Sequence, residues 1–315
     1  MKFIESFHEG ENIRDIYLCK QRTSAMTKFG KSYESVVLQD KTGQMDGKIW
    51  EPYSPGIEEF DALDYVEVSG KVNVYNGALQ LNIERVRKCR EGEYLESNYF
   101  PMSSRDIEEM YKELLGYIDK IKNEQIKHLL RLFFVEDTEF ITAFKKSSAA
   151  KSVHHGFIGG LLEHTLGVTR NAAFFADSYK HLKKDTLVAA ALFHDMGKIR
   201  EFSLFPQNDY TDDGQLIGHM VMGIEMLNEK LVNIPDFDPM IASELKHLIL
   251  SHHGEYEYGA PKKPATAEAL ALHFADNIDA KMETIKEFLD SQDPSKTWTS
   301  YNKFLDTAVK RSTEV

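Results

Sequence analysis

Histidines and aspartates recur between residues 161 and 276 of this 315-residue chain, each in or directly after an apolar stretch. Titratable groups in apolar surroundings are costly unless they are paired or bind a metal. Imidazole together with carboxylate suits Mn, Fe, Co, Ni or Zn, whereas Mg prefers oxygen ligands alone. The pattern therefore predicts a metal site, and the alternative is that these histidines cap helices or hydrogen-bond the backbone. The set is His164, His194, Asp195, His219, His252, His253 and Asp276.

An adjacent His-Asp pair follows the most apolar of these stretches. Residues 186–193 form a continuous apolar run, and the helix breaker Gly197 comes soon after it. His194 and Asp195 are therefore expected at the inner C-terminal end of a buried helix. At that position Asp195 could bridge two cations, with Lys198 about one helical turn further on.

Four residues of the set occur in the order H…HD…D, which resembles the HD superfamily of metal-dependent phosphohydrolases. These four residues are His164, His194, Asp195 and Asp276. The additional histidines resemble the two-metal branch of that superfamily. The resemblance implies that the four hold one metal and that Asp195 bridges to a second. It also implies that His219 and His252 hold this second metal, with His253 either a ligand or a group that orients its neighbour.

The same resemblance implies how such a site would work. Two divalent cations would activate water and stabilise charge on the attacked phosphate and the leaving 3′-oxygen. Mn²⁺ or Co²⁺ is favoured by the imidazole ligands, with Mg²⁺ and Fe²⁺ as alternatives. Asp195 and Lys198 are the predicted catalytic residues, and Lys198 would neutralise a phosphate oxygen in the transition state.

Short strands separated by turn residues are predicted for residues 13–90. The predicted strands are 16–20, 33–40, 47–50, 65–75 and 79–83. Alternation along 65–75 indicates one buried and one solvated face, and Asn76-Gly77 is a hairpin signal. Five strands in about eighty residues fit a small closed barrel. The motifs L-x-D-x-T-G, V-x-V-x-G-x-V and N-G-x-x-Q-L, with a strand ending in Trp, resemble an OB-fold of the nucleic-acid-binding type.

OB-folds bind single strands in a groove that offers aromatic side chains to bases and cations to the backbone. Phe29, Tyr33 and Trp50 are the predicted base-stacking residues of this barrel. The alternative is that these aromatic side chains fill the barrel core.

A small, basic and polar segment, residues 145–156, precedes Gly159-Gly160, where glycines let the backbone approach another group closely. Its position before the first metal ligand predicts an element that contacts phosphate. The alternative is an ordinary solvated start of a helix. The predicted contacts are Lys145, Lys151, His154 and His155.

The chain is therefore predicted to be multidomain, with an all-β OB-fold barrel followed by an all-α HD-superfamily helical domain. The expected boundaries are 1–97 for the barrel, 98–144 for a helical linker, 145–295 for the HD domain and 296–315 for a charged tail. Helices are predicted at 106–121, 123–134, 138–144, 161–178, 185–195, 218–232, 239–251 and 265–289.

Composition narrows the remaining options. A net charge of −12 argues against nonspecific adhesion to nucleic acid over the whole surface, although it allows a local basic groove. No stretch approaches 18 consecutive apolar residues, so we expect no membrane span. The N-terminus lacks a signal-peptide pattern, and Cys19 and Cys89 form no CxxC motif. These features predict a cytoplasmic protein with reduced thiols. No GxSxG, GxxxxGK[ST] or GxGxxG motif competes with the metal site.

An OB-fold before an HD domain, with the stretches 157–165 (FIGGLLEHT) and 268–277 (EALALHFADN), resembles the YhaM family of 3′-to-5′ exoribonucleases of low-GC Gram-positive bacteria. The resemblance spans nearly the full length. It implies removal of nucleotides from the 3′ end of single-stranded RNA, with single-stranded DNA as a second substrate, and release of nucleoside 5′-monophosphates. A homo-oligomer is a further expectation.

Two other functions stay open from the sequence alone. One is an HD-domain phosphodiesterase or nucleotidase that acts on small, including cyclic, nucleotides; the OB module argues against it, because a mononucleotide needs no strand-tracking surface. The other is a nucleic-acid-binding adaptor with an inactive HD domain, against which the complete ligand set argues.

Overall fold

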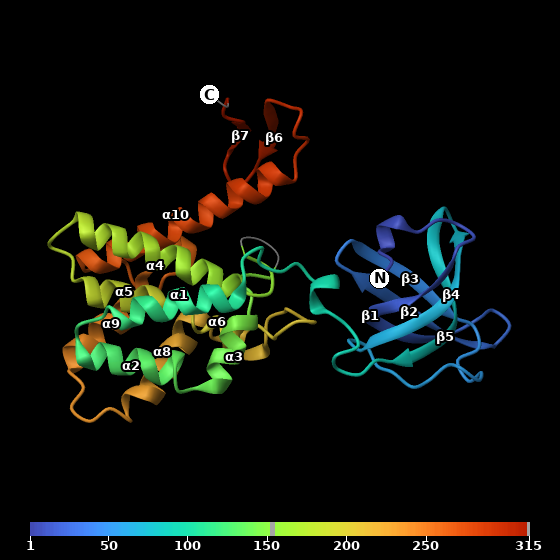
Figure 1. The fold of residues 1–315 in the computed structure, drawn as a ribbon, viewed down its shortest axis with the longest axis horizontal. Coiled ribbons are helices and arrows are strands. Elements are labelled where there is room, and N and C mark those ends of the chain that lie inside the picture. Colours follow the sequence, from blue (N-terminus) through green and yellow to red (C-terminus); the bar gives the residue numbers. More distant parts are fainter. Residues whose placement is uncertain (152–154, 314–315) are drawn as a thin grey trace. The chain divides into compact units, whose positions relative to one another are not determined.

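The computed structural model describes residues 1–151 and 155–313, and the chain divides into two compact units, Met1–Pro101 and Met102–Val315. The first unit is a β-barrel and the second is mostly helical, each with its own hydrophobic core (Figure 1). The predicted fold class is confirmed. The predicted boundaries after residues 97, 144 and 295 stay predictions.

The barrel consists of five strands, as the sequence predicts. The strands are β1 (Asn12–Met26), β2 (Ser32–Asp40), β3 (Gly43–Ile49), β4 (Tyr65–Tyr75) and β5 (Ala78–Lys88). They close in the order β1-β2-β3-β5-β4, with β3 and β5 parallel and the other neighbouring strands antiparallel. The long β1 pairs with both β2 and β4, and a bulge between Cys19 and Gln21 lets it turn from one partner to the other. This order is that of an OB-fold.

Strand β4 shows how the sequence sets this barrel. Val66, Val68 and Val72 are buried in the core, as their alternation predicts. Position 70 on the same strand requires a glycine, because a Cβ at Gly70 would be 2.1 Å from the carbonyl oxygen of Asn82 on β5. The following Asn76-Gly77 turn has positive φ at both residues, which is the geometry that favours this pair in a tight hairpin.

The helical unit begins with three helices that pack into its core. They are α1 (Ile107–Asp119), α2 (Glu124–Phe134) and α3 (Thr138–Lys146). Each starts at a residue whose side chain accepts a backbone N–H bond, namely Asp106, Asn123 and Asp137. Their apolar side chains belong to the same core as those of the later helices. The segment that was predicted to be a helical linker therefore packs as the first part of the helical unit.

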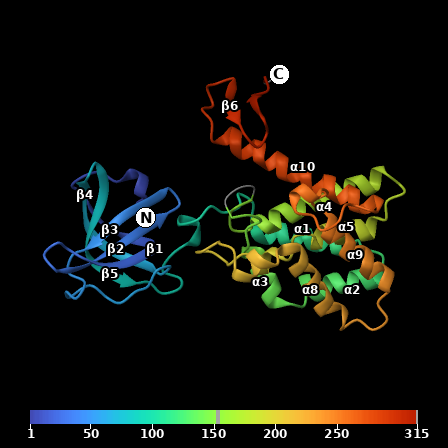
Figure 2. The ribbon, with the colours of Figure 1, turned by 180° about the vertical axis from the view of Figure 1, so that it is seen from behind.

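Helix α5 lies at the centre of this unit and positions the site. The remaining helices are α4 (Gly160–Ser178), α5 (Lys184–Phe193), α6 (Lys198–Glu201), α7 (Asp212–Leu216), α8 (His219–Leu231), α9 (Pro239–Ser251) and α10 (Ala267–Asp290). Residues 186–193 are all buried, and α5 contacts α2, α4, α9 and α10. Helix α10 runs along α4, as both views show (Figure 1 and Figure 2). Although α5 is apolar from Leu187 to Phe193, no helix in the described part of the chain is long and apolar enough to cross a membrane.

A two-stranded hairpin follows α10, where the sequence predicted only a charged tail. Its antiparallel strands are β6 (Trp298–Asn302) and β7 (Thr307–Lys310). Arg311 holds it to the end of α10, since its Nη2 donates to the carbonyl oxygens of Leu289 at 2.6 Å and Gln292 at 3.2 Å. These bonds satisfy carbonyls that the end of a helix leaves open.

Candidate metal centre

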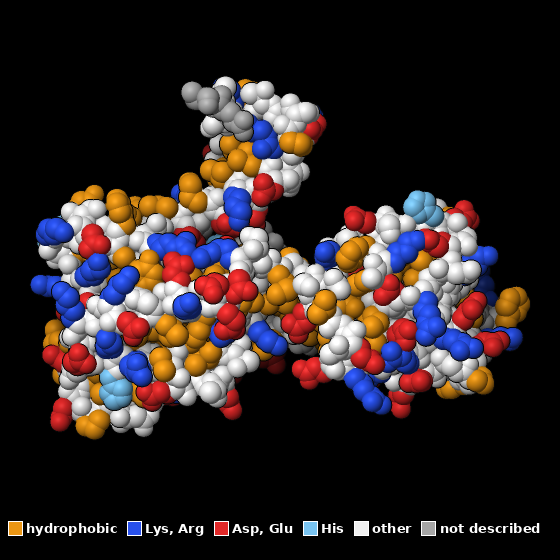
Figure 3. All heavy atoms as spheres, in the orientation of Figure 1, with side chains coloured by type: hydrophobic (Ala, Val, Ile, Leu, Met, Phe, Trp, Pro, Cys, Tyr) orange, Lys and Arg blue, Asp and Glu red, His pale blue; other side chains and the backbone are white. Residues whose placement is uncertain are grey.

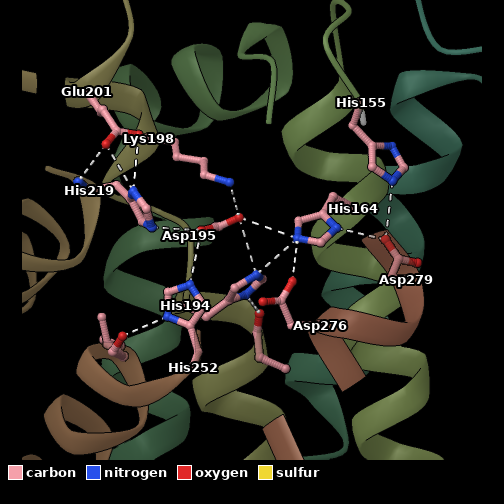
Figure 4. Close-up of polar contacts among 12 residues, drawn as sticks. His155, His164, His194, Asp195, Lys198, Glu201, His219, His252, Asp276 and Asp279 are labelled. Carbon is pink, nitrogen blue, oxygen red and sulfur yellow. Dashed lines mark hydrogen bonds and ion pairs between the residues drawn. The ribbon is translucent and has the colours of Figure 1, made fainter. Parts of the chain in front are cut away.

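Five helices of the helical unit, or the residues directly after them, bring the predicted ligands together (Figure 4). His164 lies on α4, His194 and Asp195 directly follow α5, His219 begins α8, His252 follows α9 and Asp276 lies on α10. All of these side chains are buried except that of Asp276, which is partly exposed. The structure therefore gathers into one centre residues that are more than a hundred positions apart in the sequence.

The two carboxylate oxygens of Asp195 face two different pairs of imidazoles. Its Oδ2 lies 3.4 Å from Nε2 of His164 and 3.4 Å from Nε2 of His194. Its Oδ1 lies 3.6 Å from Nε2 of His219 and 3.6 Å from Nε2 of His252. This is the arrangement expected of a carboxylate shared by two cation sites.

Two of the imidazoles are oriented by the helix ends that carry them. His194 Nδ1 lies 2.8 Å from the carbonyl oxygen of Ala191, and His252 Nδ1 lies 2.7 Å from that of Ile249. A carbonyl oxygen only accepts, so Nδ1 must carry the proton in each ring. The lone pair of each ring is then on Nε2, which points into the centre.

Two other imidazoles are oriented by carboxylates that the sequence analysis missed. His164 Nδ1 lies 2.7 Å from Asp279 Oδ2, and His219 Nδ1 lies 3.0 and 3.1 Å from the two oxygens of Glu201. Glu201 also accepts the backbone N–H of His219 at 3.0 Å. Such partners fix the ring orientation and make the imidazole a better metal ligand.

A signal for Asp279 is present in the sequence. It lies three residues after Asp276, which places both carboxylates on one face of α10. Gly167 on α4 makes room for it, because a Cβ at Gly167 would be 1.8 Å from Asp279 Oδ1. Glu201 has no comparable signal, since its partnership with His219 depends on how α6 meets α8.

The donor atoms fit divalent cations. Asp195 Oδ1 and His219 Nε2 are buried, and neither makes a hydrogen bond within residues 1–151 and 155–313, which is costly for polar atoms. The Nε2 atoms of His164 and His194, 3.3 Å apart, face each other. Among the groups whose ligand atoms lie within 4.8 Å of one another are His164 with His194 and Asp276, and His219 with His252 and His253. A cation would satisfy each of these features.

The electrostatics of the centre also favour positive charge. Burial opposes protonation of His164, but its hydrogen bonds to Asp195 and two other aspartates outweigh burial and raise its pKa well above the usual value. Burial likewise opposes ionisation of Asp195, but the charge of Lys198 holds its pKa well below the usual range. The carboxylates are therefore ionised at neutral pH, which metal binding requires.

Lys198 and His253 lie at the centre in different ways. Lys198 Nζ is 2.7 Å from Asp195 Oδ2, so its ammonium group contacts the shared carboxylate. His253 packs its ring against His252, with centroids 4.4 Å apart, and its Nδ1 lies 2.8 Å from the carbonyl oxygen of Tyr258. Burial, with the neighbouring imidazole, lowers the pKa of His253 to about 4, which keeps it neutral. The predicted catalytic role of Lys198 and the ligand role of His253 stay predictions.

The predicted phosphate-contact lysines have acidic partners in the helical unit. Lys145 Nζ lies 2.7 Å from Glu108 Oε2 and stands 4.2 Å from the ring centroid of Tyr111. Lys151 Nζ lies 2.6 Å from Asp209 Oδ1, and both side chains are exposed. A phosphate would have to compete with these carboxylates, so a substrate role of either lysine stays a prediction.

The two histidines of the same segment differ. His155 is buried, and its Nε2 lies 3.2 Å from Asp279 Oδ2, the atom that also contacts His164. His155 is therefore joined to the metal centre through Asp279, a connection that the sequence did not indicate. His154 lies outside the described residues.

In the barrel, the predicted stacking residues are accessible. Phe29 is 95% exposed and Trp50 is 48% exposed, so the alternative of core packing does not hold for them. The partly buried ring of Tyr33 lies 5.1 Å from that of Trp50, and Lys48 Nζ stands 5.7 Å from the Tyr33 ring. Figure 3 shows lysines and arginines scattered among acidic side chains on the visible face of the barrel. The base-stacking role of these three residues stays a prediction.

Known proteins supply one domain match and several distant structural neighbours. The family model of the HD domain matches residues 161–281. Among solved structures, the second OB-fold domain of replication protein A from Methanococcus maripaludis is 19% identical with a TM-score of 0.24, covering 30% of this chain and 97% of that one. The HD domain of the L. monocytogenes phosphodiesterase PgpH is 17% identical with a TM-score of 0.30, covering 50% and 76%. The strand order and the domain match define a protein with an OB-type barrel and an HD domain.

A full-length relative identifies the family. The chain is 32% identical over 296 residues to the 3′-5′ exoribonuclease YhaM of Bacillus velezensis, which covers 92% of this chain and 91% of the relative. The chain belongs to the YhaM family.

Proposed function

We propose that this chain is a metal-dependent 3′-to-5′ exoribonuclease that degrades single-stranded RNA, and also single-stranded DNA, to nucleoside 5′-monophosphates. The observation that carries the proposal is the Asp195 carboxylate, which faces two pairs of imidazoles at 3.4 and 3.6 Å. The similarity to a named 3′-5′ exoribonuclease extends over both units and supports the same activity.

Two divalent ions are proposed for the centre, shared through Asp195. His164, His194 and Asp276 would hold one, and His219 and His252, with His253, the other. Divalent cations in such a site supply activation of water and stabilisation of charge on the phosphate. Because four or five of the ligands are imidazoles, we propose Mn²⁺ or Co²⁺ rather than Mg²⁺.

The protein's own contribution is to fix the donors before substrate arrives. Each of the four buried imidazoles donates from Nδ1 to a carbonyl or carboxylate, so no ring has to reorient on binding. Lys198 brings an ammonium group to the same place, where it would neutralise a phosphate oxygen that gains charge during cleavage. Burial strengthens both interactions because the local dielectric is low.

The barrel is proposed to hold the RNA strand upstream of the cut. Tyr33 and Trp50 offer adjacent rings for stacking, Phe29 offers a third, and Lys48 supplies a positive charge beside them. Stacking on aromatic side chains is tolerant of sequence, as a degradative exonuclease requires.

A 5′-labelled single-stranded RNA tests the activity. We expect EDTA-treated, full-length protein supplied with Mn²⁺ to give a descending ladder on a sequencing gel, and Mg²⁺ to restore less activity. The same protein should leave a cyclic dinucleotide intact. Intact RNA together with a hydrolysed cyclic dinucleotide would instead establish the small-nucleotide phosphodiesterase. Full activity with Mg²⁺ alone would refute the proposed metal preference.

A further inference from the structure

A cavity of about 480 Å³ adjoins the metal centre and has no role in the arrangement described above. Its lining includes Asp276 and His253 of the centre, Lys281 on α10, and Phe304 with Leu305 from the C-terminal hairpin. We call it the hairpin pocket. Its volume lies at the lower end of the range for small-molecule sites, which suits one nucleoside rather than several.

The hairpin that closes one side of this pocket is held in place. Phe304 and Leu305 lie in its turn, where their backbone N–H groups both donate to Asn302 Oδ1, at 2.8 and 3.1 Å. The base of the hairpin is joined to the end of α10 by Arg311. The aromatic wall therefore has a defined position relative to α10, which carries Asp276.

The lining has the chemistry of a nucleobase site. Phe304 is 73% exposed and Tyr258, from the loop after α9, is 63% exposed, and both line the pocket. Exposed aromatic rings of this kind stack on bases of any sequence. Lys281 lines the same pocket and forms no ion pair with another described residue, which leaves its charge available for phosphate. The pocket thus offers two aromatic rings and one cation, and it shares part of its lining with the metal centre. This lining matches a nucleotide better than an apolar ligand.

We propose that the hairpin pocket binds the 3′-terminal nucleoside of the strand, with Phe304 and Tyr258 stacking on its base. This inference rests on the proposed exonuclease function and deepens it. Hydrolysis from the 3′ end releases one nucleotide at a time, so beyond the scissile phosphate the site must hold a single nucleoside. The hairpin pocket shares Asp276 and His253 with the centre and has room for that group.

Binding of the reaction product to the full-length, Mn²⁺-loaded protein tests this proposal without relying on turnover. We expect Phe304→Ala to raise the Kd for adenosine 5′-monophosphate about five- to hundredfold in isothermal titration calorimetry, because stacking contributes about 1–3 kcal/mol per base. The Kd for ribose 5-phosphate, which has no base, should stay unchanged. Arg311→Ala, which releases the hairpin from α10, should change both constants in the same way as Phe304→Ala.

Trp298→Ala is the matched control. Trp298 is an aromatic residue of the same hairpin, 58% exposed, and does not line the pocket, so its loss should alter neither Kd. The proposal is overturned if Phe304→Ala leaves the affinity for adenosine 5′-monophosphate unchanged or weakens ribose 5-phosphate equally. RNA hydrolysis by the wild-type protein is scored separately. If Phe304→Ala loses base-dependent affinity but the wild-type protein gives no RNA ladder, the exonuclease proposal is refuted and the pocket proposal is supported. If the wild-type protein gives a ladder but Phe304→Ala binds adenosine 5′-monophosphate as tightly as before, the pocket proposal is refuted and the exonuclease proposal is supported.

Discussion

The metal centre and the aromatic face of the barrel are built on opposite plans. In the centre the four histidines that surround Asp195 are buried, and each is fixed by a hydrogen-bond acceptor. On the barrel, Phe29 is almost fully exposed and Trp50 is about half exposed. The Trp50 ring contacts that of Tyr33, and its Nε1 donates to Asn82 Oδ1 at 3.2 Å. Chemistry on a phosphate needs donors in fixed positions, whereas a surface that follows changing bases gains from rings that can adjust.

This difference predicts two kinds of mutational effect. Substitutions in the centre should act on turnover and metal binding, since its carboxylates and imidazoles converge on one place. Substitutions on the barrel should act on RNA affinity, and by less, because several rings share the strand. The following variants test that division, from the largest expected effect to the smallest.

Asp195→Ala should lower kcat on RNA by at least about a thousandfold, because the shared carboxylate contributes several kcal/mol through both cations. RNA affinity should change by less than about twofold, since the barrel residues are untouched. Rates come from single-turnover cleavage of labelled RNA, and affinity from fluorescence anisotropy. Asp177→Ala, which removes an exposed carboxylate paired with Lys184, is the control. Turnover that survives in purified Asp195→Ala protein would rule out the proposed centre.

Asp279→Asn should weaken Mn²⁺ binding about ten- to hundredfold, since loss of a carboxylate partner behind a ligating histidine has effects of that size. The amide cannot stabilise positive charge on His164 as the carboxylate does. Excess Mn²⁺ should restore most of the activity, which a misfolded protein would not show. Metal affinity is measured by titration of the EDTA-treated protein. Asp290→Asn, an exposed position on the same helix, is the matched control, and equal Mn²⁺ affinity of all three proteins would contradict the role of Asp279.

Much of the centre could be predicted because its ligands lie in or directly after apolar stretches of the sequence. His194 and Asp195 follow the buried run of α5, where titratable side chains are costly unless they are paired or bind a metal. The residues behind the ligands were harder to predict, because Glu201 and His155 acquire their roles only through tertiary contacts. Asp279 is the exception, since its i,i+3 spacing from Asp276 in the sequence places both carboxylates on one face of a helix.

The sequence also could not show which cations are already paired. Lys145 meets Glu108 from 37 positions away and Lys151 meets Asp209 from 58. The cluster of lysines therefore predicted a contact with phosphate. In the structure, a phosphate would have to compete with the carboxylates that these lysines already contact. The terminal hairpin was missed for a different reason. Its strands are short, five and four residues, and carry too few apolar residues for a period to emerge.

The smallest effect is expected for Trp50→Ala, and it tests most directly whether the barrel surface and the metal centre have separate roles. Trp50→Ala should weaken single-stranded RNA binding about tenfold, because one stacked base contributes about 1–3 kcal/mol and neighbouring rings compensate in part. Hydrolysis of a substrate that contains no RNA strand, such as the p-nitrophenyl ester of thymidine 5′-monophosphate, should be unchanged. Trp298→Ala removes the other tryptophan of the chain and should leave long-RNA affinity as it is. Equal anisotropy curves for wild-type protein and Trp50→Ala would show that this face of the barrel does not hold the strand. A fall in kcat on the short ester would show instead that the barrel takes part in the chemistry, and the division between a fixed centre and an adjustable surface would fail.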